Sequence, residues 1–188
     1  RAVAALGRKP SDVKAILLTH GHFDHTMNAA RLKEWSGARL YAPVGDELHL
    51  AGRYPYRGIA RVCGWLEGMG RAVTRYRAPS VDVWFRDGDE LPFWGGLKVV
   101  SLPGHTAGHV GFHSAAKRVM FVGDLFAVSW RIALPPVIFS TDPAELVRSF
   151  CRAARYDVDL FVPAHYISLS NTVVQRVRAK ARRLTAKS

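Results

Sequence analysis

Four apolar stretches of the sequence each run into a small, polar or turn-forming residue next to histidine or aspartate. The stretches are KAILLT (14–19) before HGHFDH, VVSL before PGHTAGH, RVMFV before Gly-Asp, and VDLFV before Pro-Ala-His. The side chains delivered in this way are His20, His22, Asp24, His25, His105, Asp124 and His165. Strands place such ligands rigidly, and the loops after them leave a coordination position open. One histidine alone would be an ordinary surface or core residue, but this recurrence predicts a metal site at one edge of a sheet.

Length and composition fit one folded domain spanning residues 1–188. The chain has 188 residues, 48% of them hydrophobic, which is enough to bury a core and excludes disorder. No apolar run reaches the length of a membrane span and no export leader is visible, although the chain begins at Arg1; we therefore expect a cytoplasmic protein. Cys63 and Cys151 lack metal or redox spacing and are expected to be buried free thiols. The net charge of +12 favours anionic partners without identifying one.

Apolar periodicity predicts alternating strands and helices throughout the chain. The expected strands are 14–19, 38–42, 81–85, 97–102, 109–113, 118–122 and 158–163, and the expected helices are 26–35, a helix starting after Asp142, and 171–184. Segments 81–85 and 97–102 suggest a β-meander, and 109–113 with 118–122 a hairpin. Asp142, Pro143 and Glu145 form a helix-start signal. The pattern is typical of a layered α/β domain.

The order of these motifs resembles the metallo-β-lactamase superfamily of metallohydrolases over residues 16–166. The matching motifs are His-x-His-x-Asp-His, Pro-Gly-His-Thr-x-Gly-His, the Gly-Asp strand end and the late Pro-x-His. The resemblance implies an αββα sandwich with the site at one edge, between two sheets. It also implies that His20, His22 and His105 hold one metal ion, that Asp24, His25 and His165 hold a second, and that Asp124 bridges both.

The chemistry implied by the resemblance uses two Zn²⁺ ions per chain, with iron or manganese as alternatives. Imidazole suits zinc, and a carboxylate can span two cations. A water shared by two metal ions has its pKa lowered toward about 7, and the resulting hydroxide attacks a carbonyl or phosphoryl centre. Asp24 is a metal ligand that is also placed to orient this nucleophile and relay its proton; a purely ligating role fits equally well.

Other residues near the motifs are expected to have structural roles. Thr106 and Gly108 should shape their turn, and Phe23 should pack beneath its loop. His109 and His113 should be structural, and His49 should be a surface or packing residue. Two features depart from the family. Only 13 residues precede KAILLT, so strands that open the first sheet are expected in roughly 30–60 further upstream residues.

The second departure is an insert-like stretch at residues 43–78, rich in arginine and aromatic residues. It is interpreted either as a solvated helical surface or as a lid that contacts substrate. If the stretch is a lid, Arg53 and Arg57 are expected to contact the substrate, and the protein is expected to prefer anionic small substrates. The basic C-terminal helix is expected to present a solvated outer face.

These observations favour a dinuclear hydrolase of the glyoxalase II-like or lactonase-like branch, acting on a small ester, thioester, lactone or amide. The net charge keeps a nucleic-acid phosphodiesterase as an alternative. An iron-dependent persulfide dioxygenase and a non-enzymatic, metal-stabilised binding module are further alternatives. A β-lactamase proper is less favoured, because nothing in the sequence indicates export. The sequence carries no information on oligomeric state.

Overall fold

Two β-sheets face each other in the structure, a computed structural model that describes residues 2–166, 170 and 172–186. Within these residues, the first sheet has the order β1-β2-β3, all parallel, and the second has the order β10-β7-β6-β5-β4. The strands are β1 Ala15–Leu17, β2 Arg39–Pro43, β3 Val83–Phe85, β4 Glu90–Leu91, β5 Leu97–Ser101, β6 Val110–Ser114, β7 Val119–Gly123 and β10 Leu160–Pro163. In the second sheet β10 runs parallel to β7, so both strands end at the same edge.

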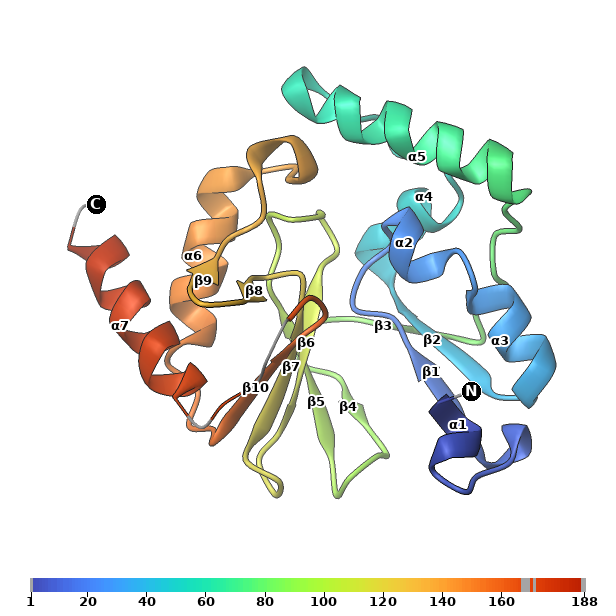
Figure 1. Cartoon of the computed structure of the whole chain (residues 1–188), viewed down its shortest axis with the longest axis horizontal. Coiled ribbons are helices and arrows are strands. Elements are labelled where there is room, and N and C mark those ends of the chain that lie inside the picture. Colours follow the sequence, from blue (N-terminus) through green and yellow to red (C-terminus); the bar gives the residue numbers. More distant parts are fainter. Residues whose placement is uncertain (1, 167–169, 171, 187–188) are drawn as a thin grey trace.

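Helices cover the outer face of each sheet (Figure 1). The helices are α1 Ala2–Ala5, α2 Phe23–Thr26, α3 Ala29–Ser36, α4 Glu47–Leu50, α5 Arg61–Thr74, α6 Pro143–Ala153 and α7 Val173–Thr185. The short 3-10 turns are η1 Pro10–Asp12, η2 Val44–Asp46, η3 Gly58–Ala60 and η4 Val137–Phe139, and β8 Ala127–Val128 with β9 Ile132–Ala133 forms a small hairpin. α3 lies outside the first sheet, α6 and α7 lie outside the second, and α5 crosses one edge above α2 and α4. The predicted αββα sandwich is confirmed.

The largest buried cluster lies between the second sheet and the helices outside it. Phe150 and Leu146 of α6 pack with Phe161 of β10 and Phe126, and all four are at most 2% exposed. Burying each such side chain contributes about 1.5–3 kcal/mol. The Asp142 side chain accepts a hydrogen bond from Glu145 N at 2.9 Å, which fixes the start of α6 as the sequence predicts. The core thus holds the ends of β7 and β10 rigidly at one edge.

One expectation about secondary structure was wrong, and the bounds of another differ. The predicted meander does not form, because β3 pairs with β2 in the first sheet while β5 pairs with β4 and β6 in the second. Asp82 fixes β3 beside β2, since its N–H donates to Leu40 O and its carboxylate accepts from Leu40 N. The predicted helix 26–35 is present as α3 but begins at Ala29, because Asn28 leaves helical geometry (φ −109°, ψ 0°), and Thr26 is the last residue of α2.

The other predicted strands and the hairpin formed by β6 and β7 are present. α7 begins at Val173, and residue 171, where this helix was predicted to start, lies outside the described residues. Among the described residues, every helix falls short of the length and apolar character needed to cross a bilayer.

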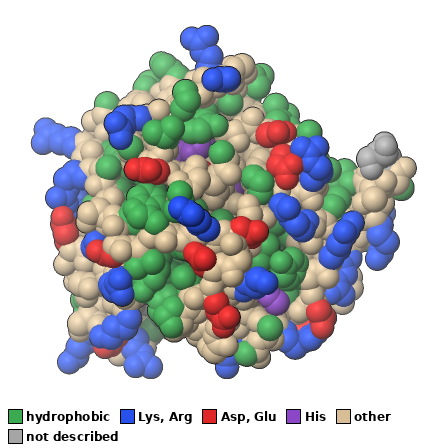
Figure 2. Space-filling model, turned by 180° about the vertical axis from the view of Figure 1, so that it is seen from behind, with side chains coloured by type: hydrophobic (Ala, Val, Ile, Leu, Met, Phe, Trp, Pro, Cys, Tyr) green, Lys and Arg blue, Asp and Glu red, His purple; other side chains and the backbone are tan. Residues whose placement is uncertain are grey.

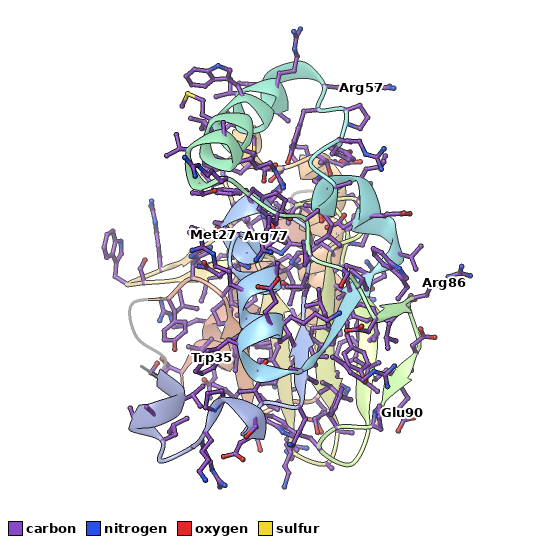
Figure 3. The ribbon with its side chains drawn as sticks, turned by 90° about the vertical axis from the view of Figure 1, so that its right-hand side faces the viewer. Met27, Trp35, Arg57, Arg77, Arg86 and Glu90 are labelled. Carbon is purple, nitrogen blue, oxygen red and sulfur yellow. The ribbon has the colours of Figure 1, made fainter. Side chains whose placement is uncertain are left out.

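On one face of the molecule, positive charge is scattered and does not gather in one stripe (Figure 2). On the face shown in Figure 2, Lys and Arg side chains are interspersed with acidic and apolar ones. The side view in Figure 3 shows α5 at the far end of the molecule, with Arg57 directed into solvent and Trp35 of α3 well below it. The charge on this face and the exposed position of α5 both bear on which partners the protein can bind.

Candidate metal centre

The first group of predicted ligands consists of His20, His22 and His105. These residues lie on two loops, and each loop follows a strand of a different sheet. His20 and His22 follow β1, whereas His105 lies between β5 and β6. Val110 N donates to Thr19 O at 2.9 Å and thereby ties the first loop to the second sheet. The three side chains each offer one ring nitrogen within 4.8 Å of the others, and all three are buried.

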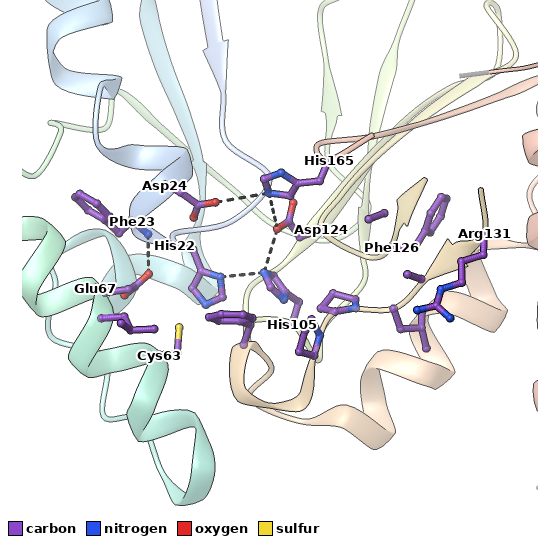
Figure 4. A pocket seen from close by; sticks show the side chains of 17 residues that line it. His22, Phe23, Asp24, Cys63, Glu67, His105, Asp124, Phe126, Arg131 and His165 are labelled. Carbon is purple, nitrogen blue, oxygen red and sulfur yellow. Dashed lines mark hydrogen bonds and ion pairs between the residues drawn. The ribbon is translucent and has the colours of Figure 1, made fainter. Parts of the chain in front are cut away.

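The second group consists of Asp24, His25, Asp124 and His165, whose ligand atoms also lie within 4.8 Å of one another. Asp24 and His25 lie on α2, Asp124 follows β7 and His165 follows β10. Within the second group, Asp124 is also next to His105 of the first group (Figure 4). One oxygen, Oδ2, is 3.5 Å from His105 Nε2 and 3.2 Å from His165 Nε2, and the other, Oδ1, is 3.3 Å from His25 Nε2. The seven predicted residues therefore converge in space.

Unpartnered polar atoms show that these residues fit metal ions. Three buried ring nitrogens of the first group have no hydrogen-bond partner, namely His20 Nε2, His22 Nε2 and His105 Nδ1. In the second group, His25 Nε2 contacts the carboxylates of Asp124 and Asp24 at 3.3 and 3.4 Å. Buried polar atoms left unpaired are costly, so they are rare in folded proteins unless they serve a site. Imidazole nitrogens and carboxylate oxygens at these separations match the donor set of a tetrahedral Zn²⁺ site.

Electrostatics differ between the two groups. Burial, reinforced by the neighbouring His25, lowers the pKa of His20 well below its usual value. Burial would also lower the pKa of His25, but its contacts with Asp124 and Asp24 outweigh this effect and raise the pKa to about 10. Burial likewise opposes ionisation of Asp24, yet its hydrogen bond with His25 lowers the pKa of this carboxyl to about 2. The two groups thus differ, because burial favours the neutral ring at His20 whereas the neighbouring carboxylates favour the protonated ring at His25.

The sequence of this chain matches one family model over residues 1–165, that of the metallo-beta-lactamase superfamily. The chain belongs to the metallo-beta-lactamase superfamily.

Named relatives agree with this assignment. The chain is 31% identical over 121 residues to a hydroxyacylglutathione hydrolase of Haemophilus influenzae, a match that covers 61% of this chain and 50% of the relative. It is 33% identical over 150 residues to a probable metallo-hydrolase of Bacillus subtilis, covering 79% of this chain and 60% of the relative. It spans about half the length of the hydroxyacylglutathione hydrolases it matches.

The fold is also that of a solved metallo-beta-lactamase family protein from Thermus thermophilus. The TM-score is 0.72 at 23% identity, with 99% of this chain and 65% of that chain covered. At this identity the likeness concerns the fold alone.

Asp46 links the two superfamily motifs that carry the first group, and sequence reasoning missed it. Its fully buried carboxylate accepts hydrogen bonds from Gly21 N (2.8 Å), Thr106 Oγ1 (2.6 Å) and Gly108 N (2.7 Å). His49 Nδ1 lies 3.2 Å from the same carboxylate. Burial would raise the pKa of Asp46, but the contact with His49 and the hydrogen bonds from Thr106 and Gly21 together lower it. Thr106 and Gly108, which were predicted to shape their turn, hold it by donating hydrogen bonds to this carboxylate.

The close approach around Asp46 requires glycine at position 108. A Cβ there would lie 2.4 Å from Asp46 N, which no ordinary side chain tolerates. His49, expected to be a packing or surface residue, is fully buried and stacks on Tyr54 with ring centroids 3.7 Å apart.

The His109 ring holds the backbone of Asp124 in place. The His109 ring is buried, its Nε2 accepts from Asp124 N at 3.1 Å, and its Nδ1 donates to Leu102 O at 3.0 Å. This arrangement defines which ring nitrogen carries the proton. Gly123 adopts φ +50°, and a Cβ there would lie 2.7 Å from His109 Nε2. His109 is structural, as expected, and its contact also orients a predicted ligand.

A cavity of about 610 Å³ opens beside the two groups. Its apolar walls are Leu66, Phe126, Ala127, Ala133, Leu134, Pro135, Pro136 and Phe139, and five of the predicted ligands also line it: His22, Asp24, His105, Asp124 and His165. Figure 4 places Glu67 and Cys63 at one end and Arg131 at the other, with His105 and Asp124 between them. Among the described lining residues, Arg131 is the one with a permanent positive charge. An apolar cavity with a few convergent polar groups is typical of a small-molecule site.

The insert contributes to this cavity, but not through the arginines singled out in the sequence. Cys63, Leu66 and Glu67 of α5 line it, whereas Arg53 and Arg57 do not. Cys63 is buried, as predicted, while Cys151 is half-buried. Cys63, Glu67 and His22 also lie close enough to hold an ion. However, burial and Glu67 raise the pKa of the Cys63 thiol to about 11, which disfavours the thiolate that binds metal.

Proposed function

We propose that this domain is a dinuclear metal-dependent hydrolase that acts on a small thioester, ester, lactone or amide. The observation that carries the proposal is the convergence of seven histidine and aspartate side chains beside an apolar cavity. The hydroxyacylglutathione hydrolase name of its relatives favours a thioester within this class.

The ligand set assigned by the motifs is His20, His22 and His105 for one ion, Asp24, His25 and His165 for the second, and Asp124 for both. Two ions held by these residues would supply a water of lowered pKa and an electrophile for the scissile carbonyl. The catalytic role of this chain falls to Asp24, whose carboxylate lines the cavity and would orient the nucleophile and relay its proton to the leaving group. Phe126 and Phe139 belong to the apolar lining of the cavity and would exclude water from the acyl part of a bound substrate. Zn²⁺ suits the imidazole-rich donor set, and iron or manganese remain alternatives.

We further propose that residues 43–78 form one wall of the site within a single domain of residues 1–188. Glu67 supports this role, because it accepts hydrogen bonds from Phe23 N at 2.6 Å and Tyr56 Oη at 2.9 Å. The insert is thereby attached directly to the loop that carries His22 and Asp24.

A screen of purified protein tests the proposed function. Elemental analysis after purification without chelator should find close to two metal ions per chain. Among matched thioester, ester, lactone and amide substrates, at least one, and the thioester first, should be hydrolysed, with activity lost on chelation and restored by metal. Protein that binds no metal overturns the proposal, and cleavage of phosphodiesters alone replaces it with the phosphodiesterase alternative. The face shown in Figure 2 carries scattered basic side chains and no basic stripe of the kind that binds nucleic acid.

Replacing Arg131 should weaken binding of anionic substrates. Arg131 is exposed at one end of the cavity, and no ion pair with it is found among the described residues, so its guanidinium is available to a substrate carboxylate. Arg131→Gln should raise KM for a succinyl thioester roughly two- to five-fold, as expected for an exposed ion pair, with little change for the neutral butyryl thioester.

The matched control is Arg182→Gln on α7, which lies outside the cavity and should leave both KM values unchanged. An equal rise for both thioesters in Arg131→Gln would show that the arginine maintains the shape of the cavity and does not recognise charge.

A further inference from the structure

α5 has its apolar side chains on the outside. Val62, Trp65, Leu66, Met69 and Val73, spaced so as to share one side of a helix, are all exposed, Trp65 by 63% and Val73 by 84%. We call these five residues the apolar face of α5. A surface helix ordinarily turns such a stripe toward the core. Here the charged residues Glu67 and Arg71 face the protein instead.

Specific contacts hold the helix in this orientation. Besides the bonds to Glu67 described above, Arg71 donates to His49 O at 3.0 Å and lies over the Tyr76 ring at 4.3 Å. Gly64 and Gly70 bring the helix backbone against rings, since a Cβ would lie 2.5 Å from Tyr56 and 2.6 Å from Phe23, respectively. Rotating the helix to bury its apolar face would break these contacts.

Exposed apolar side chains continue from α5 across the cavity. η3 and α5 both pack against η4, where Val137 is 54% exposed, and η3 itself exposes Ile59. Leu66 belongs to the apolar face and also lines the cavity, whose opposite wall includes Pro135 and Pro136. Neighbouring exposed apolar side chains of this kind are typical of an interaction site.

Charge decides what kind of partner fits. Arg57 precedes η3, Arg61 is the first residue of α5 and Arg75 follows its last residue; all three are exposed, and none has an ion pair among the described residues. Within residues 61–74 the one acid, Glu67, faces inward. A second copy docked on this face would therefore bring arginines together without compensating acids. A partner that is apolar and negatively charged satisfies both features.

We propose that the apolar face of α5 docks on an anionic lipid bilayer. A helix with an apolar stripe, flanking arginines and an interfacial tryptophan lies in the plane of the headgroups, with the apolar side chains inserted and the cations on anionic lipid. This mode of binding needs no spanning helix. It is independent of the reaction proposed above.

Sedimentation with lipid vesicles tests the inference on the whole 188-residue protein. The protein should pellet with vesicles of phosphatidylcholine containing 30% phosphatidylglycerol, not with phosphatidylcholine alone, and 0.5 M NaCl should release it. Trp65→Ser and Val73→Ser should each weaken the partition constant about ten-fold, because each removes an inserted apolar side chain. Arg61→Gln and Arg75→Gln should each weaken it about five-fold.

Two matched controls lie away from α5. Trp35→Ser removes a tryptophan that is 51% exposed on α3, and Arg183→Gln removes an exposed arginine on α7; neither should change the partition constant. Equal losses in these controls, or no pelleting with anionic vesicles, would overturn the inference. So would a dimer, seen by analytical ultracentrifugation without lipid, that Val73→Ser dissociates, because the face would then serve a second copy.

Discussion

Asp124→Ala is expected to lose metal from both positions and to lower the hydrolytic rate by roughly 10³-fold or more. The reason is geometric, because Asp124 Oδ2 is 3.5 Å from His105 Nε2 of the first group and Oδ1 is 3.3 Å from His25 Nε2 of the second. Removing the carboxylate also removes a negative charge that balances two cations. Elemental analysis and the initial rate on a thioester, measured on the same preparation, check both effects.

A matched control is Asp157→Ala, since Asp157 also pairs with a basic side chain but lies at the surface in an ion pair with Arg118. Metal content and rate should not change in this variant. A second comparison is His165→Ala, which removes a ligand from the second group alone and should leave one ion bound. Full metal content in Asp124→Ala would contradict the bridging role and leave Asp124 as a ligand of one ion at most.

Much of the candidate centre could be predicted because its residues follow a local rule. A strand ends at a turn, and the histidine or aspartate there lies at the sheet edge, as Asp124 does after β7 and His165 after β10. The parallel pairing of β7 and β10 brings these two ends together. Periodicity and turn chemistry are read within about ten residues, so they are well suited to such features.

Other residues of the site could not be predicted because their roles depend on contacts distant in sequence. Asp46 lies in an unremarkable Val-Gly-Asp turn, and its partners Gly21, Thr106 and Gly108 are 25, 60 and 62 residues away. In the sequence, Arg131 cannot be told apart from the other arginines, because its role depends on its position in the wall of the cavity. The same limit explains the wrong meander, since the strand pattern of Val83–Phe85 does not specify which strand it pairs with.

α5 shows a related limit. An amphipathic pattern identifies a helix but not which of its faces is buried, and burial of the apolar face is only the commoner outcome. In this chain the polar face is fixed by Glu67 and Arg71, whose partners Phe23 and His49 come from segments outside the helix. The orientation of such a helix becomes predictable only when the partners of its charged residues are known.

Asp46→Asn should lower the free energy of unfolding by about 3–5 kcal/mol, because it leaves buried donors unpaired around a lost charge. The amide can adopt two orientations, and neither restores the network. If the NH₂ group replaces Oδ1, it faces Gly108 N, and if it replaces Oδ2, it faces Gly21 N and can no longer accept from Thr106 Oγ1. Urea denaturation of the metal-free protein measures the loss in folding stability alone.

The same substitution should weaken metal binding about 10- to 100-fold, as is typical when a group that orients the ligands is removed. Gly21 separates His20 from His22, and Thr106 follows His105, so the network of Asp46 sets the positions of all three histidines. Asp87→Asn is the control, because Asp87 also accepts a backbone hydrogen bond, from Ser101 N at 2.7 Å, but at an exposed turn. It should cost no more than about 1 kcal/mol and leave metal affinity unchanged. Equal destabilisation by the two variants would mean that the buried network contributes no more than an ordinary surface hydrogen bond, and unchanged metal affinity in Asp46→Asn would mean that the histidines are positioned by their strands alone.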